Sequence, residues 1–335
     1  MKNNKQWQAL ACTAALFAIA ACSDSPPPEA ASAAPVGDAP VGQLSRIVEP
    51  VHYRLELRID PRWGEFSGTT SIDLNLNEAV SGIWLHGKDL EVSEVYLVDS
   101  DSSRIEASYE QHDDTGVALV SLAKPAPAGE ATLNFTYTAG FNASTNALFK
   151  VLRGDEAYAA TQFQPIAARK VFPGFDEPSF KVTFDLSLVT AADDVAITTT
   201  PETGTETLAD GSVRHTFETT RPMPTYLLAF AVGPYDVVDY GVIPPNSIRD
   251  REVRLRGVVA KGLAHRAEYA LQHTDGILTV LEEYFGTPYP YRKLDIIAVP
   301  ESFGGAMENI GAIVYDEYLI IMDENSPVSQ RRAYT

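Results

Sequence analysis

Hydrophobic and polar residues alternate along much of the chain from Pro50 onward, and this period of two is typical of half-buried β-strands. The first such segment carries apolar side chains at every odd position from Val51 to Ile59. The alternation returns at residues 72–76, 133–137 and 182–188, and shorter apolar segments lie at 83–85, 95–97 and 117–122. No comparable helical pattern precedes residue 235. The sequence therefore predicts an all-β domain, a sandwich or saddle of antiparallel sheets.

A different pattern follows this predicted β domain. The continuous apolar run at residues 226–232 predicts its last strand, closed by Gly233-Pro234. Apolar residues three or four apart then predict a helix from about Leu263 to Phe285, with Gly286 as its C-terminal cap. Strands are expected at residues 253–259, 294–299 and 312–315. One helix and a few strands indicate the beginning of a second domain rather than a complete one.

Composition and charge narrow the class of protein. The chain has 335 residues, of which 45% are hydrophobic and 21% charged, so most of it is expected to fold. Its net charge is −19 and it has no run rich in Lys and Arg, which excludes nucleic acid as a partner. We interpret the acidity as a contribution to solubility rather than as a field that attracts cationic substrates. The oligomeric state stays open.

The first 21 residues are predicted to be a lipoprotein signal peptide. Lys2 and Lys5 provide a basic start, an apolar run follows, and residues 19–22 (Ile-Ala-Ala-Cys) resemble a bacterial lipobox. This resemblance implies cleavage before Cys22 and attachment of lipid to its thiol. The alternative is a plain signal peptide with an incidental cysteine. The only other cysteine, Cys12, lies within the signal peptide, so the remaining chain has no disulfide and no thiolate metal site.

The residues that follow indicate where the protein is attached. Ser23, where an Asp would favour retention, implies sorting to the outer membrane, so we expect an exported, lipid-anchored protein facing the periplasm or the cell surface. Residues 22–45 are rich in Pro, Ala and Ser and are predicted to be a flexible tether.

The most informative loop lies between the predicted strands at 294–299 and 312–315. It reads Phe-Gly-Gly-Ala-Met-Glu-Asn at residues 303–309. Two glycines allow another backbone to approach closely, and Glu308 could then bind a cation at the end of that approach. The combination suits an extended peptide that pairs along a strand edge with its charged amino terminus at Glu308. A glycine turn followed by a solvated carboxylate is the alternative.

Residues 305–309 resemble the exopeptidase motif of the aminopeptidase N family of zinc aminopeptidases. The segment before it, residues 284–295, is similar to the family sequence that leads into this loop. Three further segments resemble the family's N-terminal domain, at residues 161–165, 169–178 and 224–230. The resemblance covers about residues 46–335. It implies an all-β N-terminal domain over residues 46–236, and the first part of a thermolysin-like α+β catalytic domain over residues 237–335.

The resemblance also implies roles for individual residues. Glu308 would bind the protonated α-amine of peptides that have a free amino terminus, with Asn309 beside it. Gly305 and Ala306 would offer backbone hydrogen bonds to the first residue of the peptide. Met307 would shape the first specificity pocket, or serve only in packing.

A glutamine replaces a carboxylate of the family at one position. Gln164 falls where many members place a second amine-binding Glu, and Gln162 would line the same pocket. An amide oxygen still accepts a hydrogen bond from an ammonium group but adds no charge. A Gln here also occurs in the branch that includes leukotriene hydrolase, which leaves epoxide hydrolysis as an alternative.

The resemblance implies one zinc ion in the intact protein, but no residue of this chain is predicted to bind it. The family holds zinc with an H-E-x-x-H helix and a further Glu, and uses that motif's Glu and a Tyr in catalysis. None of the six histidines forms such a motif. We therefore expect the motif beyond Thr335, in a longer protein of which this chain, by itself inactive, is the amino-terminal piece. The alternative is a non-catalytic, lipid-anchored protein that binds peptide termini.

Other acidic pairs have ordinary explanations. Asp176-Glu177 is predicted to belong to a structural loop with salt bridges. Glu282-Glu283 and Asp323-Glu324 are predicted to be solvated, and the histidines to be surface or strand residues.

Overall fold

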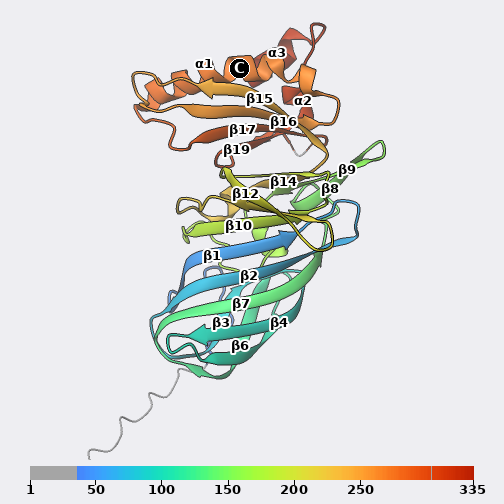
Figure 1. Ribbon diagram of the computed structural model, residues 1–335. Coiled ribbons are helices and arrows are strands. Elements are labelled where there is room, and N and C mark those ends of the chain that lie inside the picture. The colour runs from blue at the N-terminus through green and yellow to red at the C-terminus, as the bar shows by residue number, and fades with distance from the viewer. Residues whose placement is uncertain (1–35, 303) are drawn as a thin grey trace, which may run out of the picture. The chain divides into compact units, whose positions relative to one another are not determined.

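The computed structural model describes residues 36–302 and 304–335, and the strands of this part form three sheets of ten, four and five strands (Figure 1). The strands are β1 Val48–Arg58, β2 Glu65–Leu76, β3 Val80–His86, β4 Leu90–Asp99, β5 Arg104–Gln111, β6 Val117–Ala126, β7 Gly129–Gly140, β8 Ala147–Arg153, β9 Glu156–Gln162, β10 Thr183–Thr190, β11 Val195–Thr198, β12 Glu202–Thr207, β13 Val213–Phe217, β14 Phe230–Gly233, β15 Tyr235–Ile243, β16 Val253–Ala260, β17 Lys293–Val299, β18 Ala306–Met307 and β19 Ala312–Asp316.

Helices are fewer than strands in the part of the chain that the structure describes. Three single turns of 3₁₀-helix are η1 Ala168–Lys170, η2 Thr225–Leu227 and η3 Ala264–Arg266, and the α-helices are α1 Glu268–Phe285, α2 Glu317–Ile320 and α3 Val328–Tyr334. None of these helices is both long and apolar enough to span a lipid bilayer, within the part of the chain that the structure describes. The predicted fold class, a mainly β domain followed by the start of an α+β domain, is confirmed. The predicted signal peptide and Cys22 lie outside the described residues.

The ten-stranded sheet follows from the alternating pattern of its strands. Its order is β12-β13-β10-β1-β2-β7-β4-β5-β6-β3, and nearly every pair is antiparallel. Two details differ from the sequence-based prediction. β1 pairs with β10 in parallel, and a bulge between Pro50 and His52 in β1 turns Val51 outward, where it is 47% exposed. A bulge shifts the pleat by one residue, so the alternation starts only at Tyr53.

The four-stranded sheet has the order β11-β14-β9-β8. It lies between the ten-stranded sheet and the five-stranded sheet (Figure 1). The apolar run at residues 226–232 was predicted to be one strand, and this prediction is wrong in part. Its beginning forms η2, and only Phe230–Gly233 forms a strand. All the residues from 228 to 232 are buried, so the run lacks the alternation that would have distinguished its two halves.

The five-stranded sheet carries the loop that the sequence singled out. Its order is β15-β16-β17-β19-β18, with β16, β17 and β19 parallel to one another. One hydrophobic cluster joins this sheet to the four-stranded sheet, through side chains of β9, β11, β14, β16, β17 and β19. A second cluster joins its other face to α1, and Figure 1 shows the helices on that side. The five-stranded sheet therefore forms the middle of three layers.

The predicted long helix is present, with a different start and a partly exposed end. A 3₁₀ turn precedes it, α1 begins at Glu268, and Gly286 ends it with φ of 62°, as its predicted cap role requires. Ala270, Leu271 and Leu278 are buried as predicted, but Tyr284 is 82% exposed.

Part of the predicted tether contacts the β domain. Leu44 is buried, and its backbone N–H donates to Glu177 Oε1 at 2.6 Å. The indole N–H of Trp84 donates to the carbonyl oxygen of Gly37 at 3.1 Å.

Candidate functional site

The loop 304–311 forms the open edge of the five-stranded sheet. β18 is the last strand in the sheet order, and it pairs antiparallel with β19 through Ala306 opposite Tyr315 and Met307 opposite Val314. Asp316 N–H donates to Gly305 O at 2.8 Å. Because hydrogen-bonded and non-hydrogen-bonded pairs alternate in an antiparallel ladder, the backbone N–H and C=O of Ala306 point away from β19. Ala306 thus offers a donor and an acceptor at an uncovered edge.

The side chains of this edge alternate as well. Met307 is 1% exposed and Asn309 is 2% exposed, whereas Ala306 and Glu308 are exposed. Asn309 Nδ2 donates to the carbonyl oxygen of Leu227 at 3.3 Å, so it ties the loop to the β domain. The carboxylate of Glu308 makes no hydrogen bond or ion pair with any of the described residues. An acid without a partner is therefore held between two anchored neighbours.

Glycine is required at both ends of the loop. Gly305 has φ of 131°, a backbone conformation that residues with a Cβ rarely adopt. Gly311 has φ of 67°, and a Cβ there would lie 2.4 Å from the carbonyl oxygen of Thr199. The loop can therefore pack backbone to backbone against the β domain.

A buried ionic cluster fixes the downstream end of the loop. The Lys293 ammonium donates to Thr198 O at 2.7 Å, Asp295 Oδ2 at 2.7 Å and Gly311 O at 2.8 Å. These acceptors come from the β domain, from β17 and from the loop. Arg256 completes the cluster with a bidentate contact to Asp295, at 2.8 and 2.7 Å.

The ionisation of this cluster follows from its surroundings. Burial by itself would raise the pKa of Asp295, but the charges of Lys293 and Arg256 outweigh burial and hold that pKa below its ordinary value. Burial has the opposite consequence for Lys293, whose pKa it lowers, while the charge of Asp295 favours the protonated lysine. The sequence analysis missed Lys293 and Asp295. The available signal was a pair of charges, two residues apart, at the start of an otherwise apolar strand.

Gln162 is the last residue of β9 in the four-stranded sheet, and Gln164 follows two residues later. Gln162 is half-buried and its Oε1 accepts from the N–H of Gln164 at 3.4 Å, while the Gln164 side chain is exposed. β9 pairs with β14, which follows the segment that contains Leu227, the partner of Asn309. No hydrogen bond joins either glutamine to Glu308 in the described part of the chain.

The described residues supply no metal site. Within residues 36–302 and 304–335, no group of three or more His, Cys, Asp or Glu side chains is placed to hold a metal ion. His86 is buried in the β domain, and its Nδ1 accepts from the N–H of Asp176 at 3.2 Å. Burial, together with the charge of Arg169, lowers the pKa of His86 to about 3, so this histidine is neutral and structural.

The structure tests the predictions made for two of the other acidic pairs, Asp176-Glu177 and Glu282-Glu283. Asp176 forms a buried ion pair with Arg169 at 3.0 Å, which confirms the prediction of a structural loop. The prediction that Glu282 is solvated is wrong. Its side chain is 2% exposed and accepts from Arg249 Nε at 2.8 Å, Asn246 Nδ2 at 2.6 Å and Tyr289 N at 2.7 Å. Glu283, the next residue, is exposed as predicted.

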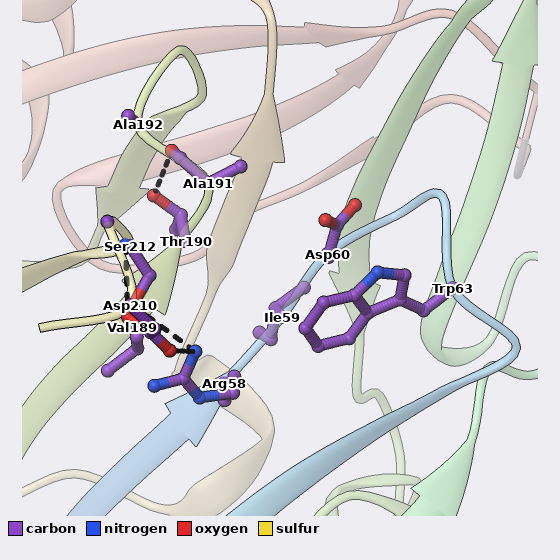
Figure 2. A pocket seen from close by; sticks show the side chains of 11 residues that line it. Arg58, Ile59, Asp60, Trp63, Val189, Thr190, Ala191, Ala192, Asp210 and Ser212 are labelled. Atoms are coloured by element: carbon purple, nitrogen blue, oxygen red, sulfur yellow. Dashed lines mark hydrogen bonds and ion pairs between the residues drawn. The ribbon is translucent and has the colours of Figure 1, made fainter. Parts of the chain in front are cut away.

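A pocket in the β domain is lined by charged side chains that already have partners (Figure 2). It has a volume of about 260 Å³ and lies between the ends of β1 and β10. Arg58 Nη1 donates to Asp210 Oδ2 at 2.9 Å and to Ser212 Oγ at 3.2 Å. Asp60 is paired with Arg62 at 2.6 Å. Because these charges neutralise one another, this pocket is not a candidate site.

Two family models match this chain, one in its first part and one in its last part. Residues 49–227 match the Peptidase M1 N-terminal domain, and residues 269–335 match the Peptidase family M1 domain. Bovine glutamyl aminopeptidase (Bos taurus) is 29% identical over 321 residues, which cover 91% of this chain and 33% of that protein.

Two further aminopeptidases are similar to this chain to about the same extent. Human endoplasmic reticulum aminopeptidase 1 is 30% identical over 309 residues, 88% of this chain and 32% of its own length. Aminopeptidase M1-D of rice (Oryza sativa subsp. japonica) is 30% identical over 288 residues, 85% of this chain and 32% of its own length. The chain spans about one third of the length of these curated relatives.

Proposed function

The chain belongs to peptidase family M1, and on that premise we propose that β18 and Glu308 hold the amino-terminal residue of a peptide in an aminopeptidase. The complete protein would remove single residues from the amino ends of peptides. The relatives named above are aminopeptidases, which supports this reaction class.

The observation that carries this proposal is the uncovered edge of β18. An extended peptide can add to such an edge through the backbone N–H and C=O of Ala306. The exposed carboxylate of Glu308 lies two residues further along the same edge and has no partner among the described residues. A charge-assisted hydrogen bond between a protonated α-amine and this carboxylate would stop the peptide after its first residue. The arrangement therefore favours exopeptidase over endopeptidase action.

The remaining predicted residues have supporting parts in this proposal. Met307 is buried, so its contribution is to pack the edge strand rather than to contact solvent. Asn309 holds the loop on the β domain through Leu227. Gln164 and Gln162 lie at the end of a strand of the neighbouring sheet, and we assign them to the wall of the same amine site, where an amide oxygen can accept but adds no charge.

Peptidases of this family generally depend on zinc. When bound, zinc would activate the water that attacks the peptide bond. The described residues provide no ligand set for this ion. The residues of this chain bind and orient the substrate.

The proposal extends to the location of the protein. The basic start, the apolar run and the Ile-Ala-Ala-Cys sequence at residues 19–22 support export and attachment of lipid at Cys22. The enzyme would then act on peptides in the periplasm or at the cell surface.

Hydrolysis by the product of the complete gene tests this function. We expect release of nitroaniline from alanyl 4-nitroanilide, and a loss of about 100-fold or more when the amino group of the substrate is acetylated, since acetylation removes the charge that Glu308 would bind. A zinc chelator should abolish the reaction and added zinc should restore it. Equal turnover of the free and acetylated substrates would refute amino-terminal specificity. Binding that depends on a free amine, without turnover, would indicate a peptide-terminus-binding protein.

A further inference from the structure

A pocket of about 400 Å³ lies where the β domain meets the five-stranded sheet, and its lining is rich in arginine. The side chains that matter here are Arg221, Arg251, Arg292, Glu218, Tyr291 and Ile310. Three guanidinium groups thus face one carboxylate, in a chain whose net charge is −19. The lining of this pocket therefore has an excess of positive charge, although the whole chain is negatively charged.

Two of the three arginines of this pocket have no acidic partner among the described residues. Arg292 Nη1 contacts Glu218 Oε1 at 3.1 Å, so one guanidinium and the one carboxylate are paired. Arg251 Nη2 donates to the carbonyl oxygen of Tyr289 at 2.6 Å, and its buried Nε has no hydrogen-bond partner. Arg221 is exposed, and neither it nor Arg251 forms an ion pair with an acid among the described residues. Donors therefore outnumber acceptors.

The rest of the lining favours a small ligand with several acceptor oxygens. The Tyr291 hydroxyl makes no hydrogen bond within the described residues, and Arg221 lies close enough to lower the pKa of this tyrosine, although burial raises that pKa more. A planar guanidinium presents its N–H groups as a fork that matches the oxygens of a carboxylate or a phosphate. The arginine that lines the pocket in Figure 2 differs, because Arg58 already has Asp210 as its partner.

We propose that this pocket binds a small oxyanion, a carboxylate or a phosphate, through Arg221 and Arg251. The site is separate from the edge of β18, but it adjoins the same loop, because Ile310 lies two residues after Glu308 and lines the pocket. Lys293, which also lines it, donates to Gly311 O. A bound anion would therefore sit against the anchored end of the loop. This inference does not depend on peptidase activity.

Calorimetric titration of the product of the complete gene with inorganic phosphate, and separately with succinate, tests the site. Saturable binding of at least one anion is expected, weakened by added sodium chloride. Arg221→Ala should weaken that binding about tenfold, because the substitution removes one charge-assisted hydrogen bond to the anion. Arg251→Gln should weaken it by a similar factor, and unchanged thermal unfolding of each variant will show that the fold is intact.

Arg332→Ala is the matched control, because Arg332 is an exposed arginine outside the pocket and the substitution changes the net charge by the same amount. It should leave the affinity unchanged. Binding of phosphate alone would identify a phosphate-bearing ligand, and binding of succinate alone a carboxylate ligand. No saturable binding of either anion, or equal affinities for Arg221→Ala, Arg251→Gln and Arg332→Ala, would overturn the proposal.

Discussion

Replacing Lys293 by methionine is expected to lower the free energy of unfolding by about 3–5 kcal/mol. The Lys293 side chain is 5% exposed, and all three of its N–H groups have oxygen acceptors between 2.7 and 2.8 Å away. Methionine has a similar volume but no donor, so the carbonyl oxygen of Thr198 would be left buried without this partner. Asp295 would keep only its contact with Arg256. Urea unfolding at neutral pH measures the loss.

Lys261→Met is the control for this substitution. Lys261 is also paired with an acid, Glu156 at 2.6 Å, but its side chain is 59% exposed. An exposed pair contributes about 0–1 kcal/mol, so the control should unfold almost as the parent chain does. Because Lys293 also donates to Gly311, amide exchange around residues 309–312 should accelerate in Lys293→Met. Equal stability of the two variants would show that the buried cluster does not hold the loop.

Replacing Glu282 by glutamine is expected to cost about 3–5 kcal/mol of folding free energy. Arg249 is fully buried, and Glu282 is its carboxylate partner. Glutamine keeps one acceptor oxygen but leaves the guanidinium charge unpaired in the interior. The neighbouring substitution Glu283→Gln provides a matched control, since Glu283 is exposed, and it should change stability by less than about 0.5 kcal/mol.

The effect of Glu282 also has a defined dependence on pH. Burial alone would raise the pKa of Glu282, but the N–H of Tyr289, the amide of Asn246 and the guanidinium of Arg249 together lower it. A carboxyl with a depressed folded-state pKa stabilises the fold above its unfolded value of about 4.3, and this stabilisation is lost as the pH falls through the folded-state pKa. The difference between the parent chain and Glu282→Gln should therefore be constant above about pH 5 and shrink in more acidic solution. A difference that grows on acidification would contradict this account.

Much of the fold follows from local patterns in the sequence. Strands such as β2 and β7 bury one face only, so their alternation is visible in the residue order. The end of α1 at Gly286 follows from the need for a left-handed residue at the cap. These features depend on short segments, and a single sequence is enough to recognise them.

Other features depend on contacts between distant segments, which local patterns do not record. The parallel pairing of β1 with β10 joins residues more than a hundred positions apart. Glu282 looks like Glu283 in the sequence, and only the packing of the segment around Arg249 against α1 buries the first and not the second. Buried charges of this kind were the main error of the sequence analysis.

The candidate site also combines features that the sequence indicates with features that only contacts between distant segments reveal. The resemblance of residues 305–309 to a family motif indicated Glu308, but only the sheet order shows that β18 is an open edge. The structure adds Lys293, Asp295 and Gly311 as the residues that fix the loop. No contact in the described residues connects Gln164 with Glu308, so the shared amine site of these two residues stays a prediction.

The most direct test of the account compares Glu308→Gln with the parent enzyme in the product of the complete gene, using alanyl 4-nitroanilide. The account predicts that kcat/KM falls about 100-fold, because glutamine can accept a hydrogen bond but carries no charge to pair with the α-amine. The low turnover of the acetylated substrate should be the same in both. Glu301→Gln, a change of an exposed acid earlier in the same loop region, should have little effect. A Glu308→Gln enzyme that keeps the parent kcat/KM would contradict the central claim that this edge binds the amino terminus.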